Sequence, residues 1–207
     1  MIEPGLMRLL AAGMFVFYVA AILFLSRVSN PLRHRQELRA DESPPSAIQA
    51  LWAATFLLPN LYPLAVAIVP AWTYGTAASF SFPFDTIVQL AGGALWLVGG
   101  ALIAWSQRPL GRFMMIQIAV AKDHELVTAG PYARIRHPMY AGVQFMVVGL
   151  ALLFLSDVLL AFAVLAVVLA NYRAGKEERL LASERGFGDA YRAYMARTGR
   201  FLPRLRT

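Results

Sequence analysis

Cysteine is absent from this chain of 207 residues, and only 15% of its residues are charged. The absence of cysteine excludes disulfide bonds, zinc-thiolate sites and cysteine nucleophiles. The chain also lacks the G-x-G-x-x-G loop that binds dinucleotides in soluble proteins. A soluble domain seldom combines so little charge with 58% hydrophobic residues, so the composition indicates an integral membrane protein.

The charged residues that are present are mostly basic, and the net charge is +7. A soluble protein with this charge could bind nucleic acid, but in a membrane protein it is more typical of loops that face anionic lipid. We therefore expect membrane lipid and no nucleic acid among the partners, and the sequence leaves the oligomeric state open. Arginine outnumbers lysine 17 to 2, which is common in GC-rich prokaryotic genomes and favours a prokaryotic inner membrane.

Five apolar stretches are long enough, or nearly so, to cross a bilayer as helices. The last two are separated only by Ser156 and Asp157, and at 1.5 Å per residue each would reach about 22–26 Å. A tight helical hairpin is predicted there, because one continuous helix would place the Asp157 carboxylate in hydrocarbon. The five stretches cover residues 5–28, 47–72, 84–105, 139–155 and 158–172.

Proline and glycine inside these stretches predict how the helices bend and pack. The second stretch contains Pro59, Pro63 and Pro70, which kink or end helices. The third contains glycine pairs at 92–93 and 99–100. Such small residues allow membrane helices to approach one another closely.

Basic residues alternate between the connecting loops. The loop after the first stretch and the polar segment before the fourth are basic, and nine Lys and Arg residues lie from Arg173 onward. The loop at 73–83 and the Ser156-Asp157 turn contain none. Five spans with the N-terminus outside would place every basic loop in the cytoplasm.

Together these patterns predict an all-α polytopic membrane protein with about five transmembrane helices, including a hairpin in the C-terminal half. A cytoplasmic loop and a C-terminal helix complete the expected fold. We expect a single integral membrane domain over residues 1–207, with N-terminal spans in 1–106 and the polar motifs in 107–207.

The segment LVTAGPYARIRHPMYAG, residues 126–142, is polar and broken although both flanks are apolar. Gly130-Pro131 interrupts any helix, and Pro138 disfavours a helical conformation at His137. A helix beginning at Pro138 would leave His137 beside backbone N–H groups at a helix N-terminus, which suits a carboxylate or another anion. The alternative is ordinary: Arg and His near a membrane often only hold the cytoplasmic face, and Tyr marks the interface.

A second polar pair, Arg173 and Glu177, stands at the end of the last apolar stretch. Four residues apart, the two side chains share one face of a helix. An exposed ion pair at a helix end would contribute only a few tenths of a kcal/mol. The pair alone does not decide between that interpretation and a functional one.

These segments in this order resemble the isoprenylcysteine carboxyl methyltransferase family. The resemblance rests on HELVTAGPY at His124–Tyr132, RHPMYAG at Arg136–Gly142, the pair Arg173 and Glu177, and FGDAYRAY at Phe187–Tyr194. It covers roughly residues 108–203, so the region 107–207 is the expected methyltransferase motif region, and the first two spans carry no matching motif.

The resemblance implies S-adenosylmethionine as cofactor, bound at the cytoplasmic face beneath the C-terminal segment. It also implies a lipophilic small-molecule or lipidated substrate that enters from the bilayer, and no metal. Arg173 and Glu177 correspond to the pair that handles the reacting group, as catalytic residues. The matched cofactor-binding residues are His124, Leu126, Val127, Gly130, Tyr132, His137 and Tyr140.

The expected reaction is methylation of a lipophilic acceptor, first of all the C-terminal carboxylate of an isoprenylated cysteine or a similar carboxylate. A carboxylate is ionised at pH 7, so the reaction needs alignment and exclusion of water more than proton transfer. Phospholipid N-methylation and S-methylation of a small thiol remain open, because the motif serves the methyl donor. A nicotinamide-dependent membrane reductase and a non-catalytic membrane protein are the alternatives from other classes.

Overall fold

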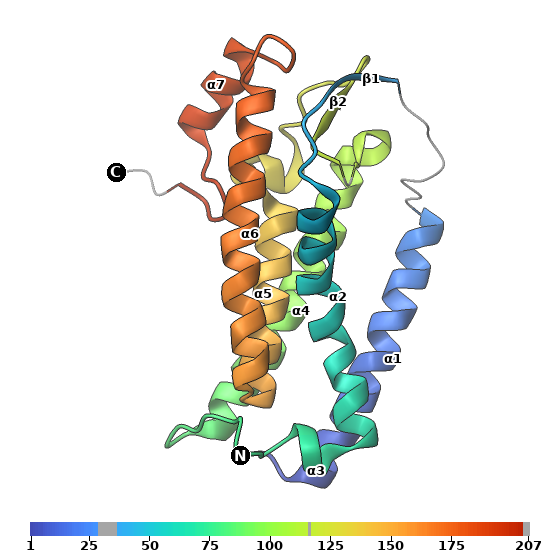
Figure 1. Cartoon of the computed structure of the whole chain (residues 1–207), viewed down its shortest axis with the longest axis vertical. Coiled ribbons are helices and arrows are strands. Elements are labelled where there is room, and N and C mark those ends of the chain that lie inside the picture. The colour runs from blue at the N-terminus through green and yellow to red at the C-terminus, as the bar shows by residue number, and fades with distance from the viewer. Residues whose placement is uncertain (29–36, 116, 205–207) are drawn as a thin grey trace.

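The computed structural model describes residues 1–28, 37–115 and 117–204. Arg33 and Arg35, which contribute to the predicted basic first loop, lie outside these residues. Five long helices form an elongated bundle (Figure 1), and each corresponds to a predicted span. They are α1 (Pro4–Val28), α2 (Ser46–Ile68), α4 (Asp85–Leu110), α5 (Pro138–Phe154) and α6 (Asp157–Leu181).

Four of these helices, α1, α2, α4 and α6, are long and apolar enough to cross a membrane, and α5 is a shorter apolar helix of 17 residues. The chain is therefore a multi-pass membrane protein with the predicted helical architecture. Three spans differ in length from the prediction, and one of them, α4, continues to Leu110 instead of ending at Trp105. The second stretch is divided, because α2 ends at Ile68 and Pro70 begins the short helix α3 (Pro70–Thr73). The last helix continues beyond Tyr172 to Leu181, where its residues become polar.

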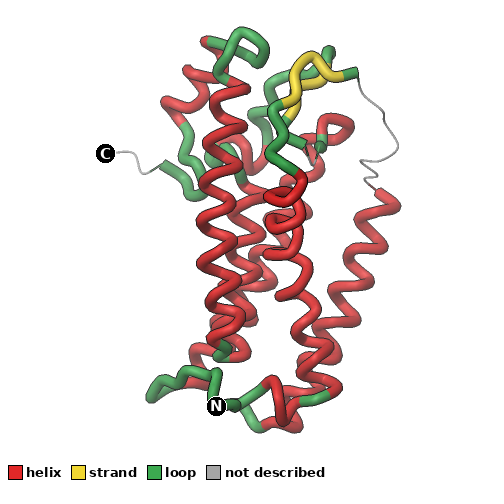
Figure 2. Tube along the Cα trace, in the orientation of Figure 1, coloured by secondary structure: helices red, strands yellow, loops and turns green. Residues whose placement is uncertain are grey.

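The predicted all-α membrane fold is confirmed, and the structure adds one short pair of strands. Strand β1 (Leu38–Asp41) pairs antiparallel with β2 (Ala119–Ala121) at one end of the bundle, as Figure 2 shows. Strands of three or four residues are too short to show a clear alternating pattern, and these two are far apart in the sequence. The remaining elements are the 3₁₀ turns η1 (Gly111–Phe113) and η2 (Gly130–Ala133), and the predicted C-terminal helix, α7 (Asp189–Arg197).

The predicted hairpin between α5 and α6 is confirmed. Leu155 ends α5 in the left-handed conformation, with φ 49°. The Ser156 hydroxyl then caps α6 by accepting a hydrogen bond from the Leu159 N–H at 3.4 Å. The backbone N–H of Asp157 donates to the Ala78 carbonyl, so this turn lies beside the loop that follows α3.

Among the described residues, the basic polar segments and the loops without basic residues lie at opposite ends of the bundle (Figure 1). The turn between α5 and α6 and the loop before α4 share one end with the N-terminus. The strand pair, η2 and α7 occupy the other end. Successive loops therefore lie at alternate ends of the bundle, as the distribution of basic residues predicted. The polar motifs all lie at the same end.

Helices α4 and α5 approach closely along two pairs of glycines. A Cβ atom added at Gly149 would lie 2.7 Å from the Gly92 carbonyl oxygen, and one added at Gly99 would lie 2.6 Å from the Gly142 carbonyl oxygen. The expected role of the glycine pairs is thus seen at Gly92 and Gly99. Around Gly100 there is nothing within 4 Å of a Cβ atom. The close approach fixes α5, which carries His137 and Tyr140 at its beginning.

Gly149→Ala is expected to lower the free energy of unfolding by about 1–3 kcal/mol, because backbone atoms of α4 have no room to move away from the new methyl group. Gly100→Ala is the matched control and is expected to be neutral or stabilising by about 0.5–1 kcal/mol, since it only removes backbone freedom. Thermal unfolding of both variants in detergent measures the difference. Equal midpoints would show that this interface is loosely packed.

Candidate active site

A cavity of about 240 Å³ lies where the polar end of the bundle meets α5 and α6. Eight of the nine site residues predicted from the sequence line it, from three separate parts of the chain. The first part is the segment before η2, the second includes η2 and the beginning of α5, and the third is the last part of α6. The eight residues are His124, Leu126, Val127, Tyr132, His137, Tyr140, Arg173 and Glu177.

Gly130 is the ninth predicted residue, and it shapes the loop without lining the cavity. It has φ +60°, a conformation that favours glycine. A Cβ atom there would lie 3.4 Å from Pro109 and 3.5 Å from Trp105, both on α4. Gly130 therefore starts η2 against α4, and two residues later Tyr132 is directed into the cavity wall.

The start of α5 follows the sequence prediction. Pro138 occupies the first turn, and His137 precedes it with non-helical φ −123° and ψ 61°. The His137 side chain is buried, and its ring stacks on Tyr140 with centroids 5.3 Å apart and planes within 5°. The N-terminal end of α5 and these two rings thus form one wall of the cavity.

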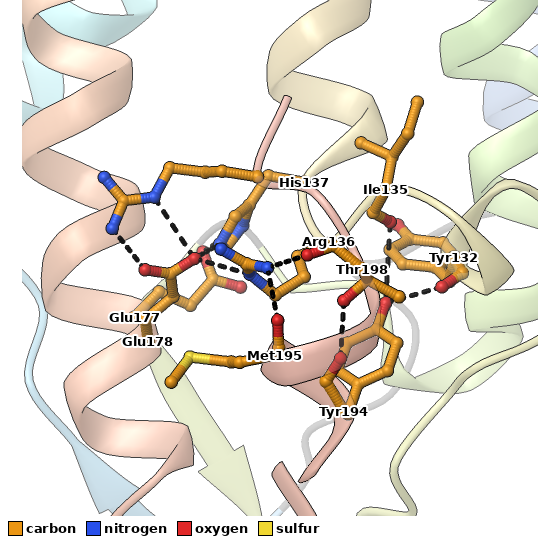
Figure 3. Close-up of polar contacts among 10 residues, drawn as sticks. Tyr132, Ile135, Arg136, His137, Glu177, Glu178, Tyr194, Met195 and Thr198 are labelled. Carbon is orange, nitrogen blue, oxygen red and sulfur yellow. Dashed lines mark hydrogen bonds and ion pairs between the residues drawn. The ribbon is translucent and has the colours of Figure 1, made fainter. Parts of the chain in front are cut away.

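Glu178 lies at the centre of a buried ionic cluster. Its Oε1 accepts from the Arg136 guanidinium at 2.8 Å and lies 3.4 Å from Nε2 of His137. Its other oxygen pairs with Arg200, which follows α7. Figure 3 shows Arg136 and His137 directed at this carboxylate. Glu178 is buried. Through its three partners, the cluster connects α6 with the start of α5 and with the C-terminal segment.

The C-terminal segment is fastened to the polar motif by backbone hydrogen bonds as well. The Gly199 N–H donates to the Arg134 carbonyl at 3.0 Å, and the Arg136 N–H donates to the Gly199 carbonyl at 2.8 Å. The Tyr194 hydroxyl donates to the Tyr132 carbonyl at 2.6 Å (Figure 3). The segment after α6 therefore closes one side of the cavity.

Glu177, the neighbour of Glu178, faces the cavity itself. Its Oε2 accepts a hydrogen bond from the Tyr140 hydroxyl at 2.8 Å and lies 3.7 Å from Nδ1 of His137. The carboxylates of Glu177 and Glu178 therefore contact different groups, although the two residues are adjacent in the sequence. Glu178 binds the cations that hold the loop and C-terminal segment, whereas Glu177 is available to a bound molecule.

Arg173 is only 2% exposed, so the interpretation of Arg173 and Glu177 as an exposed ion pair is wrong. Its guanidinium carbon lies over the Trp52 ring, 5.7 Å from the centroid. Both Arg173 and Glu177 line the cavity, as their spacing on one helical face predicted. A buried cation in a cavity wall is a suitable partner for an anionic group.

His124 also lines the cavity, among aromatic rings. The His124 ring stacks on the Phe113 ring with centroids 4.7 Å apart. The Phe187 ring meets it in a T-shaped arrangement, with centroids 5.5 Å apart. Burial lowers the pKa of His124, and the nearby Glu177 carboxylate opposes this only in part, so the imidazole is neutral at pH 7. Its buried Nδ1 has no hydrogen-bond partner among the described residues. This side of the cavity offers flat rings and a polar atom to a planar ligand.

Several lining residues lay outside the predicted site. Phe187, Tyr191 and Tyr194 belong to the C-terminal motif that the sequence analysis noted, and burial raises the pKa of Tyr194 to about 12. Arg136 was part of the matched motif but was not counted as a site residue. Trp52 also lines the cavity, but no sequence motif indicated it, because α2 carries none.

Comparisons with known proteins agree with these features. Residues 87–185 match the model of a phospholipid methyltransferase family. The fold is similar to that of a eukaryotic intramembrane Ras methyltransferase, isoprenylcysteine carboxyl methyltransferase, with TM-score 0.51 and 24% identity. That match covers 79% of this chain and 54% of the other, so the chain spans about half the length of its structural relative. No curated protein matches the chain.

The matched family segment runs from α4 to the end of α6 and so includes most of the cavity. It contains the polar motif, Arg173 and Glu177, but neither Trp52 nor α7. The family similarity is therefore to phospholipid methyltransferases over residues 87–185, and the similarity to isoprenylcysteine carboxyl methyltransferase is one of membrane fold.

Proposed function

We propose that this membrane methyltransferase uses S-adenosylmethionine to methylate the carboxylate of a lipophilic acceptor, such as an isoprenylated cysteine. The observation that carries the proposal is the buried guanidinium of Arg173, which lines the same cavity as the motif residues His124, His137 and Tyr140. A buried cation favours an anionic acceptor and disfavours a protonated amine.

The residues of the cavity fit S-adenosylmethionine. The rings of Phe113, His124 and Phe187 can hold a flat base, and the Nδ1 atom of His124 lacks a partner among the described residues. The N-terminal end of α5, at Tyr140, suits a carboxylate. Glu177 supplies a negative charge beside these groups, which suits a sulfonium. When bound, the cofactor supplies an activated methyl group.

The residues of this chain would then act mainly by positioning. Arg173 would hold the acceptor carboxylate through two parallel N–H groups and direct one oxygen at the methyl group. Tyr140 and Glu177, joined by their hydrogen bond, would fix the cofactor side of the site. Because a carboxylate is already ionised at pH 7, no general base is required. Burial of the site would exclude water from the reaction.

A phospholipid amine is the second candidate acceptor, favoured by the family model that matches residues 87–185. An amine must lose a proton before or during methyl transfer, and the Glu177 carboxylate could accept it. The buried Arg173 would repel an ammonium headgroup, which is why we place this candidate second.

Methyl transfer from labelled S-adenosylmethionine tests the proposal on the detergent-purified chain. We expect transfer to farnesylcysteine, and much less to phosphatidylethanolamine or to a small thiol. Arg134→Ala is the control, because this exposed side chain lies next to the motif but outside the cavity. Preferential methylation of phosphatidylethanolamine would favour phospholipid N-methylation over carboxyl methylation. Transfer to none of the three acceptors would contradict the proposal.

We also propose that the end with the basic loops faces the cytoplasm, since Lys and Arg concentrate there. The chain has no cysteine, so single cysteines at the exposed positions Ala77 and Glu184 report on the two ends. A membrane-impermeant maleimide added to intact cells is expected to label Ala77→Cys, and to label Glu184→Cys only after permeabilisation. Labelling of Glu184→Cys alone in intact cells would show the opposite orientation, with the basic loops outside.

A further inference from the structure

Trp52 is a residue of the cavity wall that comes from the N-terminal half of the chain. It lies on α2 and is the single described lining residue that precedes α4. It also lies outside the segment that matches the family model. Its place in the site therefore follows from the packing of α2 against α5 and α6, and from no motif.

The indole of Trp52 contacts two other residues of the site. Its ring lies beneath the Arg173 guanidinium, with 5.7 Å between the guanidinium carbon and the centroid. The Trp52 and Tyr140 rings also meet in a T-shaped arrangement, with centroids 5.2 Å apart and planes at 74°. Trp52 thus connects the cation on α6 with the ring on α5 that binds Glu177.

Tryptophan at a helix end often only anchors a protein at the membrane interface. Such an anchor is exposed to lipid, as Trp72 is, with 84% of its surface accessible. Trp52 is half-buried and faces the cavity instead. Its contacts are with site residues, so its position fits a role in the site better than a role as an anchor.

We propose that Trp52 is a positioning residue that packs against the Arg173 guanidinium and so orients it toward the acceptor carboxylate. This inference rests on the proposed function. A guanidinium binds a carboxylate through N–H groups that lie in its plane. Packing of the guanidinium over the indole ring restricts the directions in which these N–H groups can point. Without the indole, Arg173 keeps its charge and its other contacts but loses the ring that restricts its orientation.

The experiment compares Trp52→Leu and Trp52→Phe with wild type, and uses Trp72→Leu as the control on an exposed tryptophan. Methyl transfer to farnesylcysteine gives KM and kcat for the acceptor, and calorimetry gives Kd for S-adenosylmethionine. We expect Trp52→Leu to reduce kcat/KM for the acceptor at least tenfold and Trp52→Phe to reduce it less, because phenylalanine keeps an aromatic face. The Kd of the cofactor is expected to change less than twofold.

A double-mutant cycle shows whether Trp52 acts through Arg173. In an Arg173→Lys background, Trp52→Leu is expected to add less than a twofold loss, because the planar group that it holds is already gone. Additive losses, or an equal loss in cofactor affinity, would overturn the inference while leaving the proposed function intact. A wild-type chain that binds the cofactor but methylates no carboxylate overturns the proposed function, and the inference with it.

Discussion

Glu178→Ala is expected to destabilise the protein more than any other single substitution in the site, by about 3–5 kcal/mol. The carboxylate is buried and neutralises Arg136 and Arg200 while contacting His137. Removing it leaves these groups without their common partner in a partly water-excluded place. For a chain of this length, about 1 kcal/mol shifts the unfolding midpoint by about 2–4 °C, so thermal unfolding in detergent measures the loss easily.

Glu177→Ala is the matched control, because it removes the neighbouring carboxylate from the same helix. Glu177 is about one-third exposed and accepts one hydrogen bond from Tyr140, so we expect only a small change in the midpoint. Equal midpoints for the two variants would show that the cluster around Glu178 does not hold the C-terminal segment in place.

Arg173→Lys is expected to reduce turnover on the best acceptor about 10- to 100-fold, although it keeps the positive charge. Lysine lacks the planar fork that binds two carboxylate oxygens, and a hydrogen bond to a charged group contributes about 1.5–3 kcal/mol. Steady-state kinetics with farnesylcysteine measures kcat and KM. The matched control is Arg179→Lys, an exposed arginine on the same helix, which is expected to behave as wild type.

The pH profile of this reaction separates the acceptor classes. A carboxylate acceptor, with a reference pKa of about 3.5, predicts that kcat is flat above about pH 6. An amine or thiol acceptor would instead give a limb that rises toward its own pKa. Full activity of Arg173→Lys would remove Arg173 from acceptor binding, whatever the profile shows.

The sequence predicted the parts of the fold that depend on local patterns. Long apolar stretches predicted the five helices, and Pro138 predicted the beginning of α5. The polar turn at Ser156 predicted the hairpin. Each of these features is set by residues close together in the chain, where hydropathy and backbone restriction act directly.

Contacts between distant segments could not be read in the same way. The paired strands β1 and β2 are each three or four residues long and lie about 80 residues apart. Trp52 reaches the cavity because α2 packs on α5 and α6, and nothing near it in the sequence indicates this. The separate roles of Glu177 and Glu178 arise from their directions on α6. Helical spacing alone does not show which of the two meets Arg136.

The central claim is that the cavity at the polar end of the bundle binds S-adenosylmethionine. Calorimetric titration of the cofactor into the detergent-purified wild type, His137→Ala and Arg134→Ala tests it most directly. His137 is buried in the cavity wall, whereas Arg134 is exposed outside it. We predict saturable binding by wild type and Arg134→Ala, and affinity at least about tenfold weaker, or about 1.4 kcal/mol, for His137→Ala. No saturable binding by the wild type, or the same affinity in all three proteins, would contradict the account.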